Sequence, residues 1–186
     1  MKLNLKLPTR RESVIMVVAL TVWLCVTAFL IGWRTEHGFM ALLIAALFFC
    51  NGLTRKFVVA LLPFALFGIS YDWMNLVPNY TVNTVDIEGL YLAEKSLFGI
   101  DSPKGTLTPN EYFAITHWTW MDFMAGVFYL CWVPVPILFG IWLYFDRQRK
   151  IYLHFALVFL LVNLIGFAGY YIHPAAPPWY VMKHGF

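Results

Sequence analysis

Charged residues are scarce in this sequence. Of its 186 residues only 12% are Asp, Glu, Lys or Arg, whereas 61% are hydrophobic. A typical soluble domain has about 25% charged and about 45–50% apolar residues. A folded chain of this size still exposes roughly a third of its unfolded surface, so a water-soluble fold could not hide so much apolar surface. The scarcity of charge therefore excludes a soluble globular domain and predicts an integral membrane protein.

Cysteine is also scarce, and the motifs of several enzyme classes are missing. The three cysteines, Cys25, Cys50 and Cys131, lie inside apolar runs without metal-ligand spacing, so we interpret them as small hydrophobic residues. The sequence has no Walker loop, no metal-ligand cluster and no nucleophile elbow. We therefore expect no metal, no cofactor and no nucleic-acid partner.

Long apolar runs make up most of the chain. A helix that crosses a bilayer needs about 20 mostly apolar residues. The second and third runs are shorter than this, so a hairpin that fails to cross is an alternative there. We predict an all-α fold, a polytopic transmembrane helical bundle with about five spans, in a single membrane domain that covers residues 1–186. The predicted transmembrane helices are residues 14–32, 39–52, 57–71, 121–145 and 151–172.

Basic residues are unevenly distributed between the loops. Nine Lys and Arg residues precede the first span or lie between the second and third spans and between the fourth and fifth. The loops on the other side contain four, together with most of the acidic residues. Because cytoplasmic loops carry an excess of Lys and Arg, we expect a cytoplasmic N-terminus. Segment 72–120 and the C-terminal tail then share the extracytoplasmic face, of the inner membrane if the protein is bacterial.

Segment 72–120 is too polar to cross a membrane, yet it contains two helix patterns. The stretch "VDIEGLYLAEKSLFG" has apolar residues at helical spacing, and Gly99 can end such a helix. In "TPNEYF", Thr108, Pro109 and Glu111 form a capping box with proline at the first helical position. We therefore expect an extracytoplasmic loop that contains short interfacial helices.

A few polar residues and prolines in the apolar regions need an interpretation. His117 and Asp122 are five positions apart, whereas neighbours on a helix face are three or four apart. We interpret them as an interfacial histidine and a helix-start carboxylate, with a functional pair as the alternative. Asn163 is expected to bond to a partner helix, or alternatively to a ligand. Pro134 and Pro136 are expected to bend the fourth span.

The C-terminal segment "HPAAPPWYVMKHGF" begins where the last span ends. Proline cannot continue a helix, so one interpretation is a rigid helix terminator with an aromatic belt. The other is a rigid turn that holds cations and aromatic rings at headgroup level, where they would bind a lipid phosphate. Composition alone does not choose between them. The aromatic and basic residues gathered there are His173, Trp179, Tyr180, Lys183 and His184.

A resemblance favours the second interpretation. "HPAAPPWY", followed by "HG", resembles the "PAAPPWY…HG" signature of the aureobasidin-A-resistance, or inositol phosphorylceramide synthase, family. That family is a branch of the type 2 phosphatidic acid phosphatase superfamily. The stretches "YDWMNLVPNYTVNTVDIEGLYLAEKSLFGI", "LTPNEYF" and "FYLCWVPVP" also resemble bacterial relatives, so the resemblance covers about residues 60–186. Where an arginine is expected after "YDWM", this chain has Asn75, which weakens a lipid-contact role for that stretch.

The resemblance implies a lipid phosphotransferase or phosphatase. In the family, a histidine attacks the phosphorus of a lipid phosphate, an aspartate orients it, and a second histidine protonates the leaving group. A lipid hydroxyl resolves the phosphohistidine in the synthases, which moves phosphoinositol onto ceramide, whereas water resolves it in the phosphatases. Membrane lipids are therefore the expected partners. The residues expected to bind substrate are His173, Pro177, Pro178, Trp179, Tyr180 and Lys183.

The family's catalytic motifs, "PSxH" and "HxxxD", do not occur in this sequence. We therefore expect no catalytic residue within it: the nucleophilic histidine, the acid histidine and the aspartate would follow Phe186 in a longer enzyme. On this expectation the 186-residue chain alone is inactive. A lipid phosphate phosphatase and a non-catalytic membrane scaffold are the alternatives, and the gene sequence beyond codon 186 would help to separate them.

Overall fold

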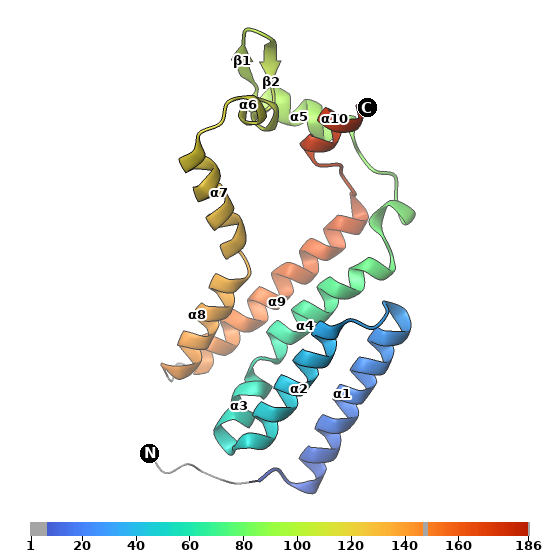
Figure 1. Cartoon of the computed structure of the whole chain (residues 1–186), viewed down its shortest axis with the longest axis vertical. Coiled ribbons are helices and arrows are strands. Elements are labelled where there is room, and N and C mark those ends of the chain that lie inside the picture. Colours follow the sequence, from blue (N-terminus) through green and yellow to red (C-terminus); the bar gives the residue numbers. More distant parts are fainter. Residues whose placement is uncertain (1–6, 147–148, 186) are drawn as a thin grey trace. The chain divides into compact units, whose positions relative to one another are not determined.

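The computed structural model describes residues 7–146 and 149–185, and α-helices account for most of them. A two-stranded antiparallel hairpin is also present, formed by β1 (Ile100–Ser102) and β2 (Gly105–Leu107), as Figure 1 shows. The expected helical membrane fold is confirmed. By its contacts the chain divides into two compact units, Met1–Val77 and Pro78–Phe186, and the single membrane domain stays a prediction. Some residues used in the predictions lie outside the described part of the chain. They are Lys2, Lys6 and Arg147, which were counted for the orientation, Phe186, and the side chain of Pro178.

The first unit contains four helices. They are α1 (Arg10–Leu30), α2 (Thr35–Cys50), α3 (Gly52–Ala60) and α4 (Leu62–Trp73), with a 3-10 turn, η1 (Met74–Leu76), after the last. A capping box starts α1, because the Thr9 side chain accepts from the Glu12 N–H and the Glu12 carboxylate accepts from the Thr9 N–H. Asn51 caps α3 in the same way. These caps explain where the helices begin.

The second unit contains both short and long helices. It contains η2 (Asn79–Thr81), α5 (Glu88–Phe98), the hairpin, α6 (Pro109–Ile115), α7 (Thr119–Cys131), α8 (Pro134–Phe145), α9 (Arg149–Ile172) and α10 (Pro178–His184). In Figure 1 the hairpin, α5, α6 and α10 lie together, and α7 and α9 extend from them. The two short helices α5 and α6 confirm the helix patterns in segment 72–120.

Proline breaks two of the predicted spans. As expected for "WVPVP", the helix bends by 50° between α7 and α8, where Pro134 and Pro136 cannot donate to the helical ladder. A second bend of 49°, which was not predicted, separates α3 from α4 and its following turn. Pro63 is the second residue of α4 there. The predicted helix 57–71 is therefore two helices joined at Leu61.

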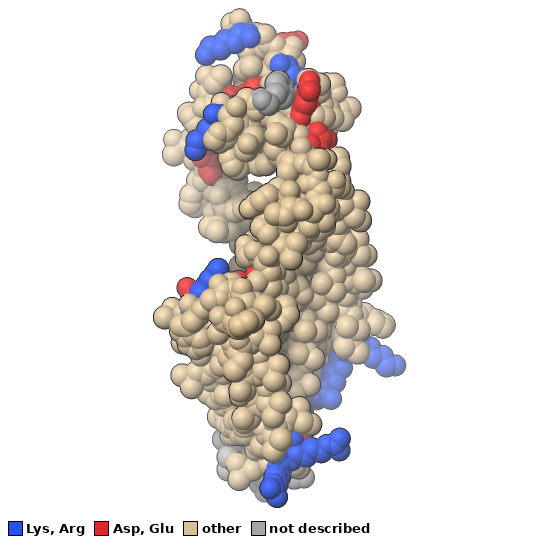
Figure 2. Space-filling view, turned by 90° about the vertical axis from the view of Figure 1, so that its right-hand side faces the viewer, with Lys and Arg blue, Asp and Glu red and all other residues tan. Residues whose placement is uncertain are grey.

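The helices α1 and α9 are each long and apolar enough to cross a membrane, and the two bent pairs meet the same criterion together. The remaining apolar helix, α2, is shorter at 16 residues, so a fifth span stays a prediction. Large apolar side chains such as Phe29 and Ile165 are exposed on these helices. On the face drawn in Figure 2, large areas of the surface contain no Lys, Arg, Asp or Glu. Such a surface is favourable in lipid.

The hydrogen bond made by the Asn163 side chain differs from the predicted one. Its side-chain N–H₂ donates to the Phe159 carbonyl oxygen, 2.7 Å away and one turn back in α9. The predicted bond to a partner helix is not seen among the described residues. The amide instead donates its hydrogen bond to a backbone carbonyl of its own helix. Such a bond is available to a polar side chain in an apolar environment without a partner helix.

Candidate functional site

The segment that follows α9 is held in place by main-chain hydrogen bonds to an earlier loop. Asp86 and Ala175 form an isolated parallel β-bridge. The Asp86 N–H donates to the Pro174 oxygen and the Ala176 N–H donates to the Asp86 oxygen, both at 2.8 Å. Pro174 and Ala176 are buried at this bridge. The "HPAAPP" segment is thus extended and anchored, which is more than helix termination requires.

A side chain of the same loop extends this anchor. Asn83 donates from its amide nitrogen to the carbonyl oxygen of Ile172, 2.8 Å away, at the end of α9. That carbonyl belongs to the last turn of the helix, whose oxygens have no partner within the helix. The residue pair is 89 positions apart in sequence. Asn83 and Asp86 together therefore fix both the end of α9 and the segment that leaves it.

The Asp86 carboxylate connects three parts of this region. Its Oδ1 accepts from the Gly89 N–H at 2.8 Å, at the start of α5. Its Oδ2 lies 3.4 Å from Nε2 of His173, whose side chain is 70% exposed. A Cβ atom on Gly89 would lie 2.6 Å and 2.7 Å from the two carboxylate oxygens, so a side chain there would displace the Asp86 carboxylate. The histidine is thereby held near an acidic partner while its ring stays accessible.

The helix α10 presents the rest of the signature. Pro177 is its N-cap and Pro178 its first residue, so the missing proline N–H costs no helical hydrogen bond. Trp179 is exposed, whereas Tyr180 is half-buried with its ring 4.7 Å from the ring of His184. The exposed Lys183 and His184 lie in the last turn, where the helix dipole favours cations.

A glycine ends this helix. Gly185 has φ +76°, a backbone conformation that a residue with a side chain rarely adopts. Its N–H donates to the Val181 oxygen at 2.8 Å. The glycine of the "HG" signature is therefore explained by the turn after α10.

The neighbouring helices α5 and α6 pack against α10. The capping box predicted for "TPNEYF" is confirmed: the Thr108 side chain accepts from the Glu111 N–H and the Glu111 carboxylate accepts from the Thr108 N–H. Thr108 is fully buried. Asn110, in the first turn of α6, lies with its amide nitrogen 3.0 Å from the Met182 sulfur in α10. The cap thus sets the position of α6 against the signature helix.

A hydrogen bond connects α5 and α6. The Tyr91 hydroxyl donates to a Glu111 carboxylate oxygen at 2.8 Å. Burial, and then this bond to the acidic group, raises the pKa of the Tyr91 hydroxyl. Burial by itself would raise the pKa of the Glu111 carboxyl, but hydrogen bonds from Thr108 and Tyr91 outweigh it, so that pKa is lowered. Glu111 is therefore a stable anion between the two helices.

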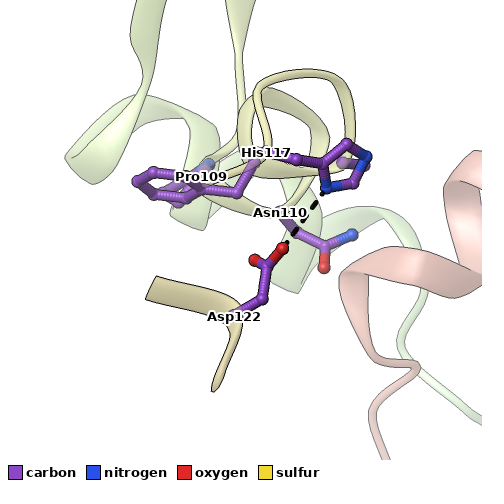
Figure 3. A pocket seen from close by; sticks show the side chains of 6 residues that line it. Pro109, Asn110, His117 and Asp122 are labelled. Carbon is purple, nitrogen blue, oxygen red and sulfur yellow. Dashed lines mark ion pairs between the residues drawn. The ribbon is translucent and has the colours of Figure 1, made fainter. Parts of the chain in front are cut away.

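A pocket opens beside this contact, between α6 and the start of α7. Its volume is about 500 Å³, and Pro109, Asn110, Phe113, Ala114, His117 and Asp122 line it. Figure 3 shows His117 and Asp122 pointing toward one another, with the Asn110 amide directed toward α10. The His117 Nδ1 and Asp122 Oδ2 atoms are 3.8 Å apart. Asp122 is in the first turn of α7, as predicted.

The first unit has a separate polar cluster that was not predicted. Asp72, in the last turn of α4, lies with its Oδ1 atom 3.3 Å from Arg34 Nη1 and its Oδ2 atom 3.1 Å from His37 Nε2. His37 is buried, and its Nδ1 atom has no hydrogen-bond partner among the described residues. The cluster joins the loop after α1 and the start of α2 to the end of α4.

Within residues 7–146 and 149–185, no group of three or more His, Cys, Asp or Glu side chains could hold a metal ion. The basic side chains near the signature are Lys183, His184 and His173. Such side chains can hold phosphoryl oxygens directly. The chemistry that this surface suits is therefore the binding of an anionic, phosphate-bearing group.

We compared the sequence with models of protein families and with known proteins, and the family match indicates the class of protein. Residues 106–186, which contain α6–α10, match the family model described as the PAP2 superfamily. The chain is similar to the phosphoinositol dihydroceramide synthase of Bacteroides thetaiotaomicron, with 60% identity over 180 residues. The alignment covers 97% of this chain and 59% of the relative, so the chain spans less than two thirds of that protein's length. No solved structure matches the chain. The resemblance to inositol phosphorylceramide synthases within the PAP2 superfamily is confirmed.

The residues predicted to bind substrate fall at two positions in the second unit. His173 lies at the β-bridge beside Asp86, and the others belong to α10 or its cap. Sequence reasoning missed the residues that hold them, Asn83, Asp86 and Asn110. An Asp three residues before Gly89 suggests a helix cap, but no local pattern reveals a partner 89 positions away.

Proposed function

We propose that this protein is a membrane lipid phosphotransferase that moves a phosphoinositol headgroup from a phospholipid donor to a ceramide-like acceptor. The observation that carries the proposal is the anchored signature segment, which the Asp86–Ala175 bridge fixes as an exposed surface of cations and aromatic rings. The similarity to a synthase of that name supports the same reaction. The proposed substrate-binding residues are the predicted His173, Pro177, Pro178, Trp179, Tyr180 and Lys183, to which we add His184 in the same turn as Lys183.

In this proposal the chain's residues bind and orient the donor. Lys183 and His184, in the last turn of α10, hold the oxygens of the phosphodiester. Trp179 and Tyr180 place aromatic rings at the headgroup level, where such amphipathic side chains are favoured. The nucleophilic histidine, the orienting aspartate and the acid histidine of the family belong to "PSxH" and "HxxxD" motifs, which are not among these 186 residues. The histidine attacks the donor phosphorus, the phosphorus–oxygen bond to the lipid alcohol of the donor breaks, and the acid histidine protonates that alcohol. The acceptor hydroxyl then attacks the phosphohistidine, the phosphorus–nitrogen bond breaks, and the hydroxyl proton passes to the second histidine.

A lipid phosphate phosphatase is the second candidate, because the matched family model is that of the PAP2 superfamily. The two activities differ in what resolves the phosphoenzyme, a lipid hydroxyl or water. An assay that contains both ceramide and water therefore separates them by product. A non-catalytic scaffold would form neither product.

The topology proposal completes this picture. We infer a cytoplasmic N-terminus, with α10 and segment 72–120 on the extracytoplasmic face, from the distribution of Lys and Arg between loops. The named relative is bacterial, which favours the inner membrane. The donor and acceptor would then be lipids of the outer leaflet of that membrane.

The test uses the full-length gene product in lipid nanodiscs that contain phosphatidylinositol and a ceramide. We expect transfer of phosphoinositol to ceramide in the wild type. Lys183→Gln removes a charge from the phosphate site and should lower kcat/KM by about 10²-fold, as removal of one transition-state donor does. The matched control is Lys104→Gln, an exposed lysine in the hairpin turn, which should change the rate by less than about 2-fold.

Each outcome has a distinct meaning. Release of inositol phosphate without ceramide product supports the phosphatase. Equal loss of activity in Lys183→Gln and Lys104→Gln would contradict a specific role for α10. No turnover by the full-length protein with any phospholipid would refute the enzymatic proposal. The 186-residue chain, assayed in parallel, is expected to be inactive.

A further inference from the structure

The pocket between α6 and α7 has the lining that a neutral polyhydroxyl group requires. Asn110 and Asp122 supply amide and carboxylate groups, and His117 supplies a ring nitrogen that can donate or accept. Phe113 provides an apolar wall. Ligand sites usually combine apolar walls with a few convergent polar groups, and this open hollow of about 500 Å³ has both.

The polar groups of this pocket have bonding capacity left for a ligand. The His117–Asp122 contact of 3.8 Å is longer than a hydrogen bond, and the two side chains are 67% and 60% exposed. In the described part of the chain no hydrogen bond to the Asp122 carboxylate oxygens is found. A carboxylate has about four lone-pair sites, so Asp122 can accept from two hydroxyl groups at once.

Charge determines which part of a headgroup enters. Asp122 is the acidic residue of the pocket lining, and it repels a phosphate while accepting hydrogen bonds from hydroxyl groups. The basic residues Lys183 and His184 lie outside the lining, in the last turn of α10. A phosphate attached to a polyol would therefore be oriented with its phosphate at α10 and its hydroxyls at Asp122.

The α6–α7 pocket and the helix α10 are adjacent. Asn110 lines the pocket and its amide nitrogen lies 3.0 Å from the sulfur of Met182, the residue before Lys183. The helices α6 and α10 pack against each other. The pocket and α10 are therefore neighbouring parts of the second unit, as a site for one polyol phosphate requires.

From this arrangement we propose that the α6–α7 pocket is the polyol subsite of the donor headgroup, with Asp122 and Asn110 as the residues that select an inositol-like ring. The assignment of the polyol to a phospholipid donor rests on the proposed function. The binding of a polyol phosphate does not, since it is argued from the pocket lining and the adjacent basic residues of α10. Asp122 and Asn110 are specificity-determining residues and take no part in the phosphoryl transfer itself.

The binding experiment uses the purified chain in detergent micelles and isothermal titration calorimetry. The probes are sn-glycero-3-phosphoinositol, free myo-inositol and inorganic phosphate. We expect Asp122→Asn to weaken binding of glycerophosphoinositol about 10-fold or more, because a hydrogen bond to a charged group is lost. Binding of inorganic phosphate should stay within about 2-fold, because phosphate needs only the α10 cations.

Two further variants control for structure. Glu88→Gln removes another exposed carboxylate from the first turn of a helix, α5, at a position that does not line the pocket. Glu88→Gln should leave the affinities for all three probes unchanged. Both Glu88→Gln and Asp122→Asn remove a negative charge from the first turn of a helix, so the control includes any loss of helix-dipole interaction. Asn110→Ala is a second pocket variant, and like Asp122→Asn it should weaken the binding of glycerophosphoinositol. Circular dichroism confirms that each variant is folded.

A turnover experiment with the full-length protein separates this inference from the proposed function. We expect Asp122→Asn to raise KM for phosphatidylinositol about 10-fold, with kcat changed less than about 2-fold, as for lost uniform binding. Wild-type glycerophosphoinositol binding no tighter than phosphate binding, or unchanged binding in Asp122→Asn, would overturn the subsite. If Asp122→Asn loses polyol binding but the wild type transfers no headgroup, the subsite is supported and the proposed function fails.

Discussion

Single residues in the second unit connect pieces of chain that are far apart in sequence. Asp86 uses its main chain to hold the segment after α9 and its side chain to start α5 and approach His173. Glu111 caps its own helix and accepts from Tyr91 of α5. In both cases one carboxylate satisfies backbone N–H groups at a helix start and also contacts a second element. The site therefore depends on a few multiply bonded acidic residues.

Acid should loosen α6. The folded protein lowers the pKa of the Glu111 carboxyl, so its ionised form contributes stability that is fully present above the unfolded value of about 4.3. That contribution is lost as pH falls from there through the lower folded value. We expect amide hydrogen exchange in α6, corrected for the intrinsic rate, to become faster below about pH 4.

Glu111→Gln tests the origin of this effect. The variant cannot ionise, so its α6 exchange should already be faster at pH 7 and should lose the acid-dependent step. Glu88→Gln, a first-turn variant of α5, should keep the wild-type profile. An identical pH profile in Glu111→Gln and the wild type would show that another group is responsible.

At the scale of elements, proline divides the apolar segments into shorter rigid pieces. The bends of 49° and 50° occur where Pro63, and Pro134 with Pro136, begin a new helix. Proline lacks an N–H, and so leaves carbonyl oxygens of the preceding turn without their helical partner. In lipid such groups are tolerated where protein or water can satisfy them. The bends therefore point to places where the helices border protein or a cavity.

Replacing both prolines of the second bend should straighten the pair. Two helices of 13 and 12 residues with a short break lengthen by about 4 Å end to end when a 50° bend is removed, at about 1.5 Å per residue. We expect the double variant Pro134→Ala and Pro136→Ala to show this increase. Double electron–electron resonance between spin labels at positions 121 and 145 measures it. Pro103→Ala, in the hairpin turn, should leave the distance unchanged.

At the scale of the whole molecule, the charge distribution matters more than the net charge of +3. The proposed site residues follow the last long apolar helix, α9, whereas Arg149 and Lys150 begin it. If α9 crosses the membrane, these two groups lie on opposite sides. The orientation of the protein thus decides on which side of the membrane the proposed site residues lie.

Cysteine labelling tests that orientation. In a full-length protein with Cys25, Cys50 and Cys131 replaced by alanine, single cysteines are introduced by Lys183→Cys or Lys56→Cys. We expect a membrane-impermeant maleimide to label position 183 in intact spheroplasts and position 56 only after lysis. Labelling of position 56 in intact cells, with position 183 protected, would reverse the topology. Both variants should react equally in detergent, which controls for local accessibility.

Much of the helical architecture followed from the sequence, because its signals are local. Apolar runs predicted the membrane class, the Thr108 capping box predicted the start of α6, and the prolines of "WVPVP" predicted a bend. Two local features were missed. Pro63 was not recognised as a break, and the strands of the hairpin have only three residues each, too few to show an alternating pattern.

The sequence by itself determined that this is a membrane protein, where most of its helices lie, and which family signature it carries, because length, apolarity, caps and motif letters are properties of neighbouring residues. Only the tertiary structure decided which distant groups meet. The contacts of Asn83 with Ile172, Asn110 with Met182 and His37 with Asp72 join residues 89, 72 and 35 positions apart. Such pairings depend on how whole helices pack, and the free energy that selects them is not contained in any local pattern.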